Sequence, residues 1–529
     1  MSKTEDAVSI FLREKFGENI REIQALQREK VFIRVDPGVH KEVLGVLLAN
    51  DEYAGISAIT GLDLGNSIEL LYHVRSRGKI ITIRTTVPKD QPRIGTITDI
   101  CTGADFHERE VADLLGVTFS GHPSPGRFLL PDTWPDDIIP LRKDAKVSDI
   151  VEVPEKNIVA EQAAPASNGE RMINVTIGPQ HPALIEPEKF SLSVDGEIVK
   201  KVVPRLGYVH RGIEKATEQR TYLQNIYLVE RICGICNACH ASAFCQAVEA
   251  IGQTSIPSRA AYLRTIIQEL NRLQSHMLLL GHFGYEIGFE SLFQYIWRDR
   301  EPLMNIMEML TGNRVMASFV TIGGVRRDLK AELIPKIKKD LAYLQKRMVF
   351  YRNMFENDGT LALRVKNVGV ISKLDAIKLC VVGPVARSSG ISMDVRKDEP
   401  YAAYAEIPFK IVTYTEGDSW ARLMVRVDEI TESINIINYA LDNLPSGSYR
   451  VKVPRTVPVG EAISRVEAPR GELFYYVKSN GSVYPERVKM RTPTFANILA
   501  FARIAEGGNI ADVPASFASL DPCFSCTDR

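Results

Sequence analysis

The spacing of hydrophobic residues first indicates a β-hairpin near the N-terminal end of the chain. A turn signal at residues 76–78 separates two β-rich runs that extend from residue 67 to residue 88. In the first run, large apolar side chains occupy alternate positions, namely Ile68, Leu70, Tyr72 and Val74. Because successive side chains of a strand point to opposite faces, this alternation is typical of a strand that covers a core. The two runs therefore predict a hairpin in a small α+β domain.

After residue 171 the hydrophobic period becomes helical. In the segment 258–283, apolar residues recur every three or four positions, and Gly281 is a candidate stop signal. The segments 328–355 and 420–445 repeat this pattern, and Pro335 is expected to kink or delay the first of them. Amphipathic helices of this length imply a bundle. The predicted fold class is α+β, with a small N-terminal α+β domain followed by a large, mainly helical domain with a central helix bundle.

Proline and small residues mark the boundary between the two domains. The segment 121–144 is too rich in proline for a helix or a central strand, and we expect an extended surface arm there. The segment 145–171 loses periodicity and gains Pro, Ala, Ser, Asn and Gly, which is typical of a linker. The predicted domains are therefore residues 1–144 and residues 172–529.

Composition narrows the classes of function. Lys+Arg and Asp+Glu both number 65, and this neutrality disfavours nucleic acid as a partner. An apolar run of about 18 residues and a secretory leader are both missing from the sequence, so a chain without a transmembrane segment is expected. Eight cysteines are too few for a disulfide scaffold. Three of them, Cys101, Cys245 and Cys380, stand apart and are predicted to be buried thiols.

Four other cysteines form two C-x-x-C pairs, Cys233 with Cys236 and Cys523 with Cys526. A C-x-x-C turn lets two sulfurs converge on one ion, and a distant pair completes a four-thiolate shell only if the fold joins both ends of the domain. Cys239 lies outside this four-ligand pattern. Spacing alone favours a structural zinc site, with an iron–sulfur cluster or another metal as the alternatives.

The residues around both pairs resemble a family of metalloenzymes. "RICGICNACH" and "DPCFSCTDR" resemble the paired signatures of the large subunit of nickel-iron hydrogenases. "GADFHEREVADLLGVTFSGHPSPGRFLLPDTWPDDIIPLRKD" resembles the 30 kDa subunit of respiratory complex I, and "GPQHPALIEPEKF" and "LGYVHRGIEK" resemble its 49 kDa subunit. A fusion of the two with both cysteine pairs is similar to the large subunit of a group 4 membrane-bound hydrogenase of the formate hydrogenlyase type. The alternative is a fused quinone-reducing complex I subunit, but complex I homologues lack the four cysteines.

The resemblance implies a nickel-iron centre whose iron carries carbon monoxide and cyanide. By match to the family's motifs, Cys236 and Cys526 bridge the two metals, whereas Cys233 and Cys523 are terminal ligands of nickel. Thiolate ligands stabilise nickel as its oxidation state changes. A terminal thiolate can also accept a proton. The implied reaction is the reversible formation of H2 from protons and electrons. Evolution of H2 coupled to the oxidation of formate or ferredoxin is the expected direction.

Further residues match the catalytic surroundings in this family. Cys523 is expected to be the first proton acceptor, because an arginine is a poor base. Arg470, in "VEAPRGEL", is expected to position bound hydrogen, with Pro469 as its apolar cover and Asp521 holding its guanidinium. Glu186, in "GPQHPALIEPEKF", is expected to relay protons from the buried site.

Other matches concern groups that orient the ligands. Arg231 and His240 are expected to orient the first cysteine pair by hydrogen bonds. Glu214 matches a glutamate that binds magnesium in many hydrogenases, but the C-terminal histidine that usually shares that ion is Arg529 here, so a magnesium site stays open. The segment 383–390, "GPVARSSG", is expected to supply donors to the diatomic ligands.

The resemblance also implies partners, location and processing. The sequence contains no further cysteine cluster for an electron relay. An iron–sulfur hydrogenase small subunit, ferredoxin-like electron-transfer subunits and membrane-arm subunits are therefore expected, with this chain peripheral on the cytoplasmic face of the cell membrane. We also expect that proteolysis after Arg529 removes a C-terminal extension once nickel is in place. If the chain is instead a complex I subunit, His181 and His210 match the positions that shape the quinone pocket of complex I.

Overall fold

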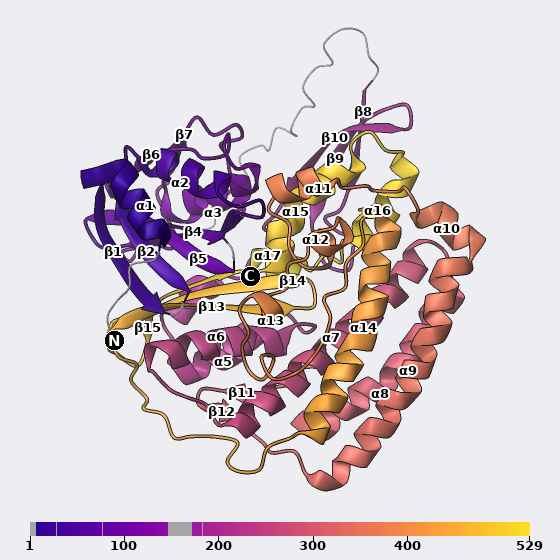
Figure 1. Cartoon of the computed structure of the whole chain (residues 1–529). Helices are drawn as coiled ribbons and strands as arrows, with labels where there is room; N and C mark the ends of the chain where they lie inside the picture. The colour runs from indigo at the N-terminus through magenta and orange to yellow at the C-terminus, as the bar shows by residue number, and fades with distance from the viewer. Residues whose placement is uncertain (1–6, 28, 77, 147–171, 182–183) are drawn as a thin grey trace.

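A mixed five-stranded sheet forms the N-terminal part of the chain in the computed structural model (Figure 1). The structure describes residues 7–27, 29–76, 78–146, 172–181 and 184–529. The strand order is β1-β2-β5-β4-β3, with the bounds β1 Ile20–Gln27, β2 Lys30–Val35, β3 Gly55–Asp63, β4 Ser67–Ser76 and β5 Lys79–Pro88. Strands β2 and β5 run parallel, whereas β4 and β5 are antiparallel with Ser67 opposite Pro88. This pairing confirms the predicted hairpin.

Both faces of the sheet are largely buried along β2 to β5. One face packs against three helices, α1 Ala7–Phe16, α2 His40–Ala49 and α3 Asp105–Leu115. The alternate apolar side chains of β4 all lie in that core. The opposite face packs on strands β13 Gly460–Ala468 and β14 Gly471–Ser479, where Leu71 shares a cluster with Phe474 and Tyr476. The N-terminal domain is therefore docked on the second part of the chain through a buried apolar surface.

The segment 121–144 contains no helix or strand, as its prolines predict. The expectation of a surface arm is wrong for its middle, because Leu129 and Leu130 are buried. One carboxylate oxygen of Asp113, on α3, accepts from the backbone N–H of Leu129 at 2.9 Å and from that of Leu130 at 2.7 Å. These bonds satisfy backbone donors that would otherwise be buried without a partner. All but the first two residues of the predicted linker 145–171 lie outside the described residues.

Four long helices pack side by side as the predicted bundle (Figure 1). Their bounds are α7 Ser258–Glu286, α8 Glu290–Thr311, α9 Ile334–Asn357 and α14 Ser419–Asp442. Gly281 does not end α7. A Cβ at this position would lie 3.3 Å from the Ile296 side chain of α8, so the glycine instead permits close packing of the two helices. Pro335 lies in the first turn of α9, where its missing N–H is no loss.

Two antiparallel three-stranded sheets in the second part are not apparent from the sequence pattern. Their orders are β10-β9-β8 and β13-β14-β15, with the bounds β8 Ile173–Ile177, β9 Lys189–Asp195, β10 Ile198–Arg205 and β15 Pro485–Arg491. Nearly every side chain of β13, β14 and β15 is buried, so polar and apolar residues do not alternate between a wet and a dry face. Charged residues are paired inside instead, as in Arg465 with Glu472 at 3.0 Å. The broad α+β class holds, but the second part is more mixed than predicted.

Shorter elements surround the bundle and the sheets. The helices are α4 Ile213–Thr217, α5 Tyr222–Glu230, α6 Asn237–Ile251, α10 Gly359–Val365, α11 Lys373–Lys378, α12 Pro384–Ser388, α13 Val395–Asp398, α15 Pro493–Ala505, α16 Val513–Ser519 and α17 Phe524–Asp528. The short strands are β6 Arg93–Gly95, β7 Thr118–Ser120, β11 Val320–Thr321 and β12 Gly324–Val325. None of the helices in the described ranges is long and apolar enough to cross a bilayer. Helix α17 lies near the middle of the molecule, between the N-terminal sheet and the bundle (Figure 1).

Candidate metal centre

Two loops that are far apart in the sequence bring four cysteines together. Cys233 follows α5 and Cys236 precedes the first residue of α6, whereas Cys523 precedes α17 and Cys526 lies within it. The sulfur of Cys233 lies 3.3 Å from that of Cys523, and the sulfur of Cys236 lies 3.3 Å from that of Cys526. All four side chains are buried. Each member of one C-x-x-C pair therefore faces a member of the other.

The chemistry of this cluster fits a soft metal cation. The ligand atoms of Cys233, Cys523 and Cys526 lie within 4.8 Å of one another, and so do those of Cys236, His240 and Cys526. Hydrogen bonds from neighbouring thiols, that of Cys236 first, hold the pKa of Cys233 well below its usual value. The bond to Cys233 raises the pKa of Cys236 and of Cys523 well above the usual value, and burial adds to the effect. The protein groups by themselves therefore favour the deprotonated form of only one of the four cysteines. Deprotonation of all four requires the positive charge of a bound cation.

His240, on α6, lies against a cysteine of each pair rather than against the first pair alone. Its Nε2 atom is 3.6 Å from the sulfur of Cys526, and it also groups with Cys236. Its Nδ1 atom is 2.7 Å from the hydroxyl of Tyr475 on β14. Burial lowers the pKa of His240 to about 4, so the imidazole is neutral at pH 7. Tyr475 therefore holds a neutral imidazole against the cysteine cluster.

The turn between β13 and β14 places Arg470 in the same interior. Its Nη2 atom is 2.6 Å from a carboxylate oxygen of Asp521, and its Nε donates to the Asp521 carbonyl at 2.8 Å. Burial opposes the charge of Arg470, but Asp521 and then Cys523 raise its pKa well above the usual value. Pro469 is buried in the same turn. The guanidinium is therefore a fixed cation beside the thiols and is not placed to act as a base.

The half-buried carboxylate of Glu186 binds Ser525, one of the two residues between the C-terminal cysteines. One of its oxygens accepts from the backbone N–H of Ser525 at 2.6 Å, and the other accepts from the Ser525 hydroxyl. The pKa of Cys523 is raised first by its bond to Cys233 and also by the negative charge of Glu186. Glu186 thus connects the cysteine cluster to a partly exposed loop.

Arg231 lies at the surface and does not orient the cysteines in the expected way. Its guanidinium donates to the carbonyl of Tyr227 at 3.0 Å, which satisfies an acceptor at the C-terminal end of α5. The arginine that joins the two loops is Arg211, which sequence reasoning missed. It donates to the carbonyl of Ile232 at 3.0 Å and to that of Ser525 at 2.8 Å. Local sequence spacing gives no sign of this contact between distant segments.

Glu214 is enclosed by three basic side chains. Its carboxylate lies 2.7 Å from Arg487, 3.1 Å from Arg529 and 3.5 Å from Lys489. Burial opposes its ionisation, yet these cations, Lys489 first, lower the pKa of Glu214 well below the usual value. A magnesium ion would face three positive charges here. These residues therefore do not fit a magnesium site at Glu214.

The N-terminal domain completes this group of charges. Glu110, on α3, lies 2.5 Å from the ammonium of Lys489 and also pairs with the guanidinium of Arg529. Lys489 and Glu110 are 379 positions apart in the sequence, so no local pattern indicates the pair. His210 also reaches the C-terminal segment, because its Nδ1 lies 2.7 Å from the Asp528 carbonyl, whereas His181 is exposed. The last residues are thus held by both domains.

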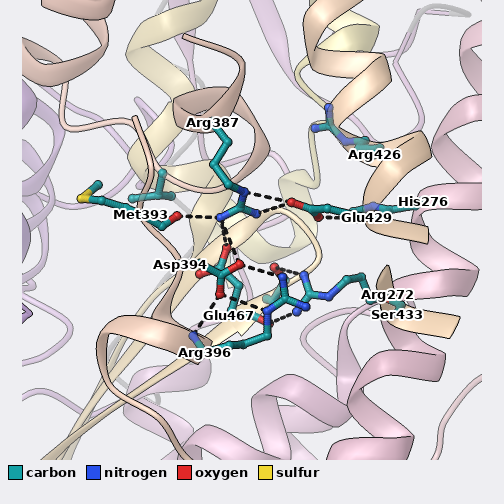
Figure 2. Close-up of polar contacts among 12 residues, drawn as sticks. Arg272, His276, Arg387, Met393, Asp394, Arg396, Arg426, Glu429, Ser433 and Glu467 are labelled. Atoms are coloured by element: carbon teal, nitrogen blue, oxygen red, sulfur yellow. Dashed lines mark hydrogen bonds and ion pairs between the residues drawn. The ribbon is translucent and has the colours of Figure 1, made fainter. Parts of the chain in front are cut away.

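A buried network of arginines and carboxylates surrounds Glu467 on β13 (Figure 2). Arg426, on α14, lies 3.7 Å from Asp521. Arg387, within the segment 383–390, donates to Glu429 at 2.9 Å and to Glu467 at 2.9 Å. The guanidinium of Arg387 is therefore ion-paired with protein carboxylates, while its Nη2 atom has no hydrogen-bond partner among the described residues. The network fixes the surroundings of β13 by charge as well as by packing.

Comparison with known families agrees with this arrangement. Residues 33–151 match the family described as respiratory-chain NADH dehydrogenase, 30 Kd subunit. Residues 286–458 and 451–529 match respiratory-chain NADH dehydrogenase, 49 Kd subunit, and residues 211–285 match nickel-dependent hydrogenase. The fold and the buried site thus define an oxidoreductase subunit of the class that unites complex I and nickel-dependent hydrogenases.

Individual relatives place the chain more closely. The fused C/D subunit of NADH-quinone oxidoreductase from Phocaeicola vulgatus is 35% identical over 90% of this chain and 95% of that protein. Membrane-bound hydrogenase subunit alpha of Pyrococcus furiosus is 39% identical over 68% of this chain and 88% of that protein. A solved chain of the membrane-bound sulfane sulfur reductase, an archaeal respiratory membrane complex, is 33% identical with a TM-score of 0.66 and covers 69% of this chain and 100% of its own length. The chain belongs to the family of the 49 kDa subunit and nickel-dependent hydrogenases, with a 30 kDa-like domain fused to it.

Proposed function

We propose that this chain is the catalytic subunit of a membrane-associated hydrogenase complex that interconverts H2 with protons and electrons. The observation that carries the proposal is the buried convergence of Cys233, Cys236, Cys523 and Cys526, whose sulfurs meet in pairs 3.3 Å apart. The four cysteines form no disulfide, and their sulfurs are soft donors that suit a centre of nickel and iron. A nickel-iron centre would supply a redox-active Lewis acid for the reaction. The match to membrane-bound hydrogenase subunit alpha of Pyrococcus furiosus supports this function.

The protein's own groups then divide the work of handling protons. Cys523, as a terminal thiolate, accepts the first proton, because its bond to Cys233 and the negative charge of Glu186 raise its pKa and so favour the protonated form. Arg470 stays protonated, since Asp521 binds it through both the side chain and the backbone. Glu186 is bound to the backbone next to Cys526 and half-buried, so it carries protons between the cluster and the outside. Pro469 excludes water from the turn that holds Arg470.

The partner subunits are inferred from the electron-transfer groups that this sequence does not supply. Electrons need an iron–sulfur small subunit and ferredoxin-like subunits, because the sequence has no further cysteine cluster. Membrane-arm subunits made by other chains would anchor the complex at the cytoplasmic face of the membrane. A formate hydrogenlyase type of complex is the more specific proposal, since both halves of the fusion and both cysteine pairs are present.

A second candidate is a quinone-reducing subunit of complex I type. The match over 90% of this chain to the fused C/D subunit of an NADH-quinone oxidoreductase favours it, because that protein has the same fused architecture. The four converging thiols are the observation against it. The two candidates differ in their metal content, which makes metal analysis the decisive measurement.

The test compares the native complex with two cysteine variants. We expect nickel in the wild type, with iron in excess of nickel because the iron–sulfur subunits also contain iron, together with infrared bands of carbonyl and cyanide, and loss of nickel in Cys526→Ser. Cys239→Ser is the matched control, since burial raises the pKa of that thiol to about 12 and its sulfur points to Asn271 at 3.8 Å. Zinc without the carbonyl and cyanide bands would show that the cysteines form a structural zinc site. A complex that lacks nickel and reduces quinone would favour the second candidate.

A further inference from the structure

Two of the isolated cysteines meet across the boundary between the N-terminal domain and the second part. Cys101 lies just before α3, and Cys380 follows α11. Their sulfur atoms are 3.5 Å apart, although the residues are separated by 279 positions in the sequence. Both thiols are buried, at 7% and 3% exposure. A disulfide needs sulfurs about 2.05 Å apart, so an approach of roughly 1.5 Å would join them.

The backbone around the pair leaves room for the two sulfurs. A Cβ atom at Gly55 would lie 2.9 Å from the sulfur of Cys380, and one at Gly103 would lie 2.7 Å from the same atom. Both distances are below ordinary contact, so only glycine admits the thiol at these positions. The space around Cys380 is therefore made by a strand residue of the N-terminal sheet and by the segment that follows Cys101.

The neighbouring thiol and a buried arginine both favour the thiolate form of Cys380. Arg75, on β4, is 7% exposed, and its Nη1 atom has no hydrogen-bond partner within the ranges that the structure describes. The hydrogen bond from Cys101, followed by the charge of Arg75, lowers the pKa of Cys380 to about 6, while the pKa of Cys101 is raised well above its usual value by the same bond. Cys380 is thus the nucleophile and Cys101 the proton-bearing partner.

A cavity lies beside the segment that carries Cys380, although neither cysteine is among its lining residues. Its volume is about 240 Å³, and Tyr53 and Arg75 of the N-terminal domain line it together with Val382 and Gly383 of the second part. Val382 and Gly383 follow Cys380 within three positions, and Arg75 contributes to both the cavity and the thiol pair. A hydroperoxide is small enough for this space and reacts with thiolates.

We propose that Cys101 and Cys380 form a redox-controlled disulfide that joins the N-terminal domain to the second part, with a hydroperoxide as the oxidant. The Cys380 thiolate attacks the peroxide, takes one oxygen to become a sulfenic acid, and releases hydroxide or alkoxide. The Cys101 sulfur then attacks that of Cys380, the S–O bond breaks, and the oxygen leaves as water with the thiol proton. With hydrogen peroxide, two thiols and one peroxide give one disulfide and two waters. Such bonds in reducing compartments are transient and regulatory.

The bond would restrain a segment that supports the metal centre. Gly383 lies three positions after Cys380, and a Cβ there would lie 2.4 Å from the carbonyl oxygen of Arg470. The backbone that Cys380 leads into is therefore in direct contact with the turn that carries Arg470. The disulfide would tie this contact to the N-terminal sheet.

The test treats the native complex with hydrogen peroxide, blocks free thiols by alkylation and digests the chain with trypsin without reduction. The disulfide would join the tryptic peptides 94–109 and 379–387, each of which contains one cysteine, with the loss of two hydrogens. We expect this cross-linked species after peroxide treatment and its disappearance after dithiothreitol. Neither peptide contains a cysteine of the metal centre, so the result is independent of the proposed hydrogenase activity.

Variants separate this disulfide from general oxidation. Cys101→Ser and Cys380→Ala should each abolish the cross-linked species, whereas Cys245→Ser, which removes a buried thiol on α6, should retain it. Recovery of both cysteines as alkylated thiols after peroxide treatment would overturn the proposal. Conversion of the two cysteines to separate sulfinic or sulfonic acids, without the cross-link, would also overturn it.

Discussion

The ion pairs of Glu110 permit a quantitative test of the coupling between the N-terminal domain and the C-terminal segment. Glu110→Gln keeps the shape of the side chain but removes the charge that faces Lys489 and Arg529. Glu110 and Glu214 together face three cations in the native protein, because Arg487 also pairs with Glu214. The variant would leave a single side-chain carboxylate against those three cations, all of which are buried.

Burial sets the magnitude of the expected loss. The side chains of Glu110 and Lys489 are 1% and 2% exposed, so solvent screens their pair little. Removal of one partner of a buried ion pair costs about 3–5 kcal/mol. The pair of Lys41 and Asp99 in the same domain has a similar length of 2.6 Å, but its side chains are 39% and 57% exposed. Such a surface pair contributes about 0–1 kcal/mol, so Asp99→Asn is the matched control.

Urea unfolding of the full chain, followed by circular dichroism, measures this difference. We expect Glu110→Gln to lower the free energy of the first unfolding transition by about 3–5 kcal/mol, and Asp99→Asn to lower it by at most about 1 kcal/mol. Both substitutions remove one negative charge from the same domain, so the comparison isolates the effect of burial. Equal losses in the two variants would refute the reasoning, since they would show that Glu110 is not held in a desolvated pair.

Three further changes test the site and the N-terminal domain. Arg470→Lys should leave nickel bound and lower H2 turnover roughly 10²-fold, because lysine keeps the charge but loses the planar fork; unchanged turnover would contradict a positioning role. Burial raises the pKa of Glu108 from 4.5 to about 7, so its contribution to stability is complete below pH 4.5 and decreases as the pH rises to about 7. Glu108→Gln should remove this decrease in urea titrations and stabilise the protein at about pH 8 by roughly 3 kcal/mol; an unchanged pH profile would contradict the assignment. Gly383→Ala, at φ 67° and against the Arg470 carbonyl, should cost at least about 1–3 kcal/mol in thermal unfolding, whereas Gly359→Ala adds its methyl group to open space and should not.

The sequence by itself determined those features that depend on neighbours within one turn or one strand. The hairpin of β4 and β5 follows from a period of two and a local turn signal, and the long helices of the bundle follow from a period near 3.6. Each C-x-x-C pair also defines half of a thiolate site locally, because two sulfurs three positions apart can converge without strain. These inferences need no knowledge of what the rest of the chain does.

The tertiary structure alone decided which distant groups meet. Glu110 reaches Lys489 across 379 positions, and Arg211 joins Ile232 to Ser525. The same holds for strands β13 to β15, whose charged residues are buried in pairs and therefore lack the alternation that marks a half-exposed strand. The physical reason is that a buried polar group must find its partner wherever packing brings one, and the position of that partner leaves no period or spacing in the sequence.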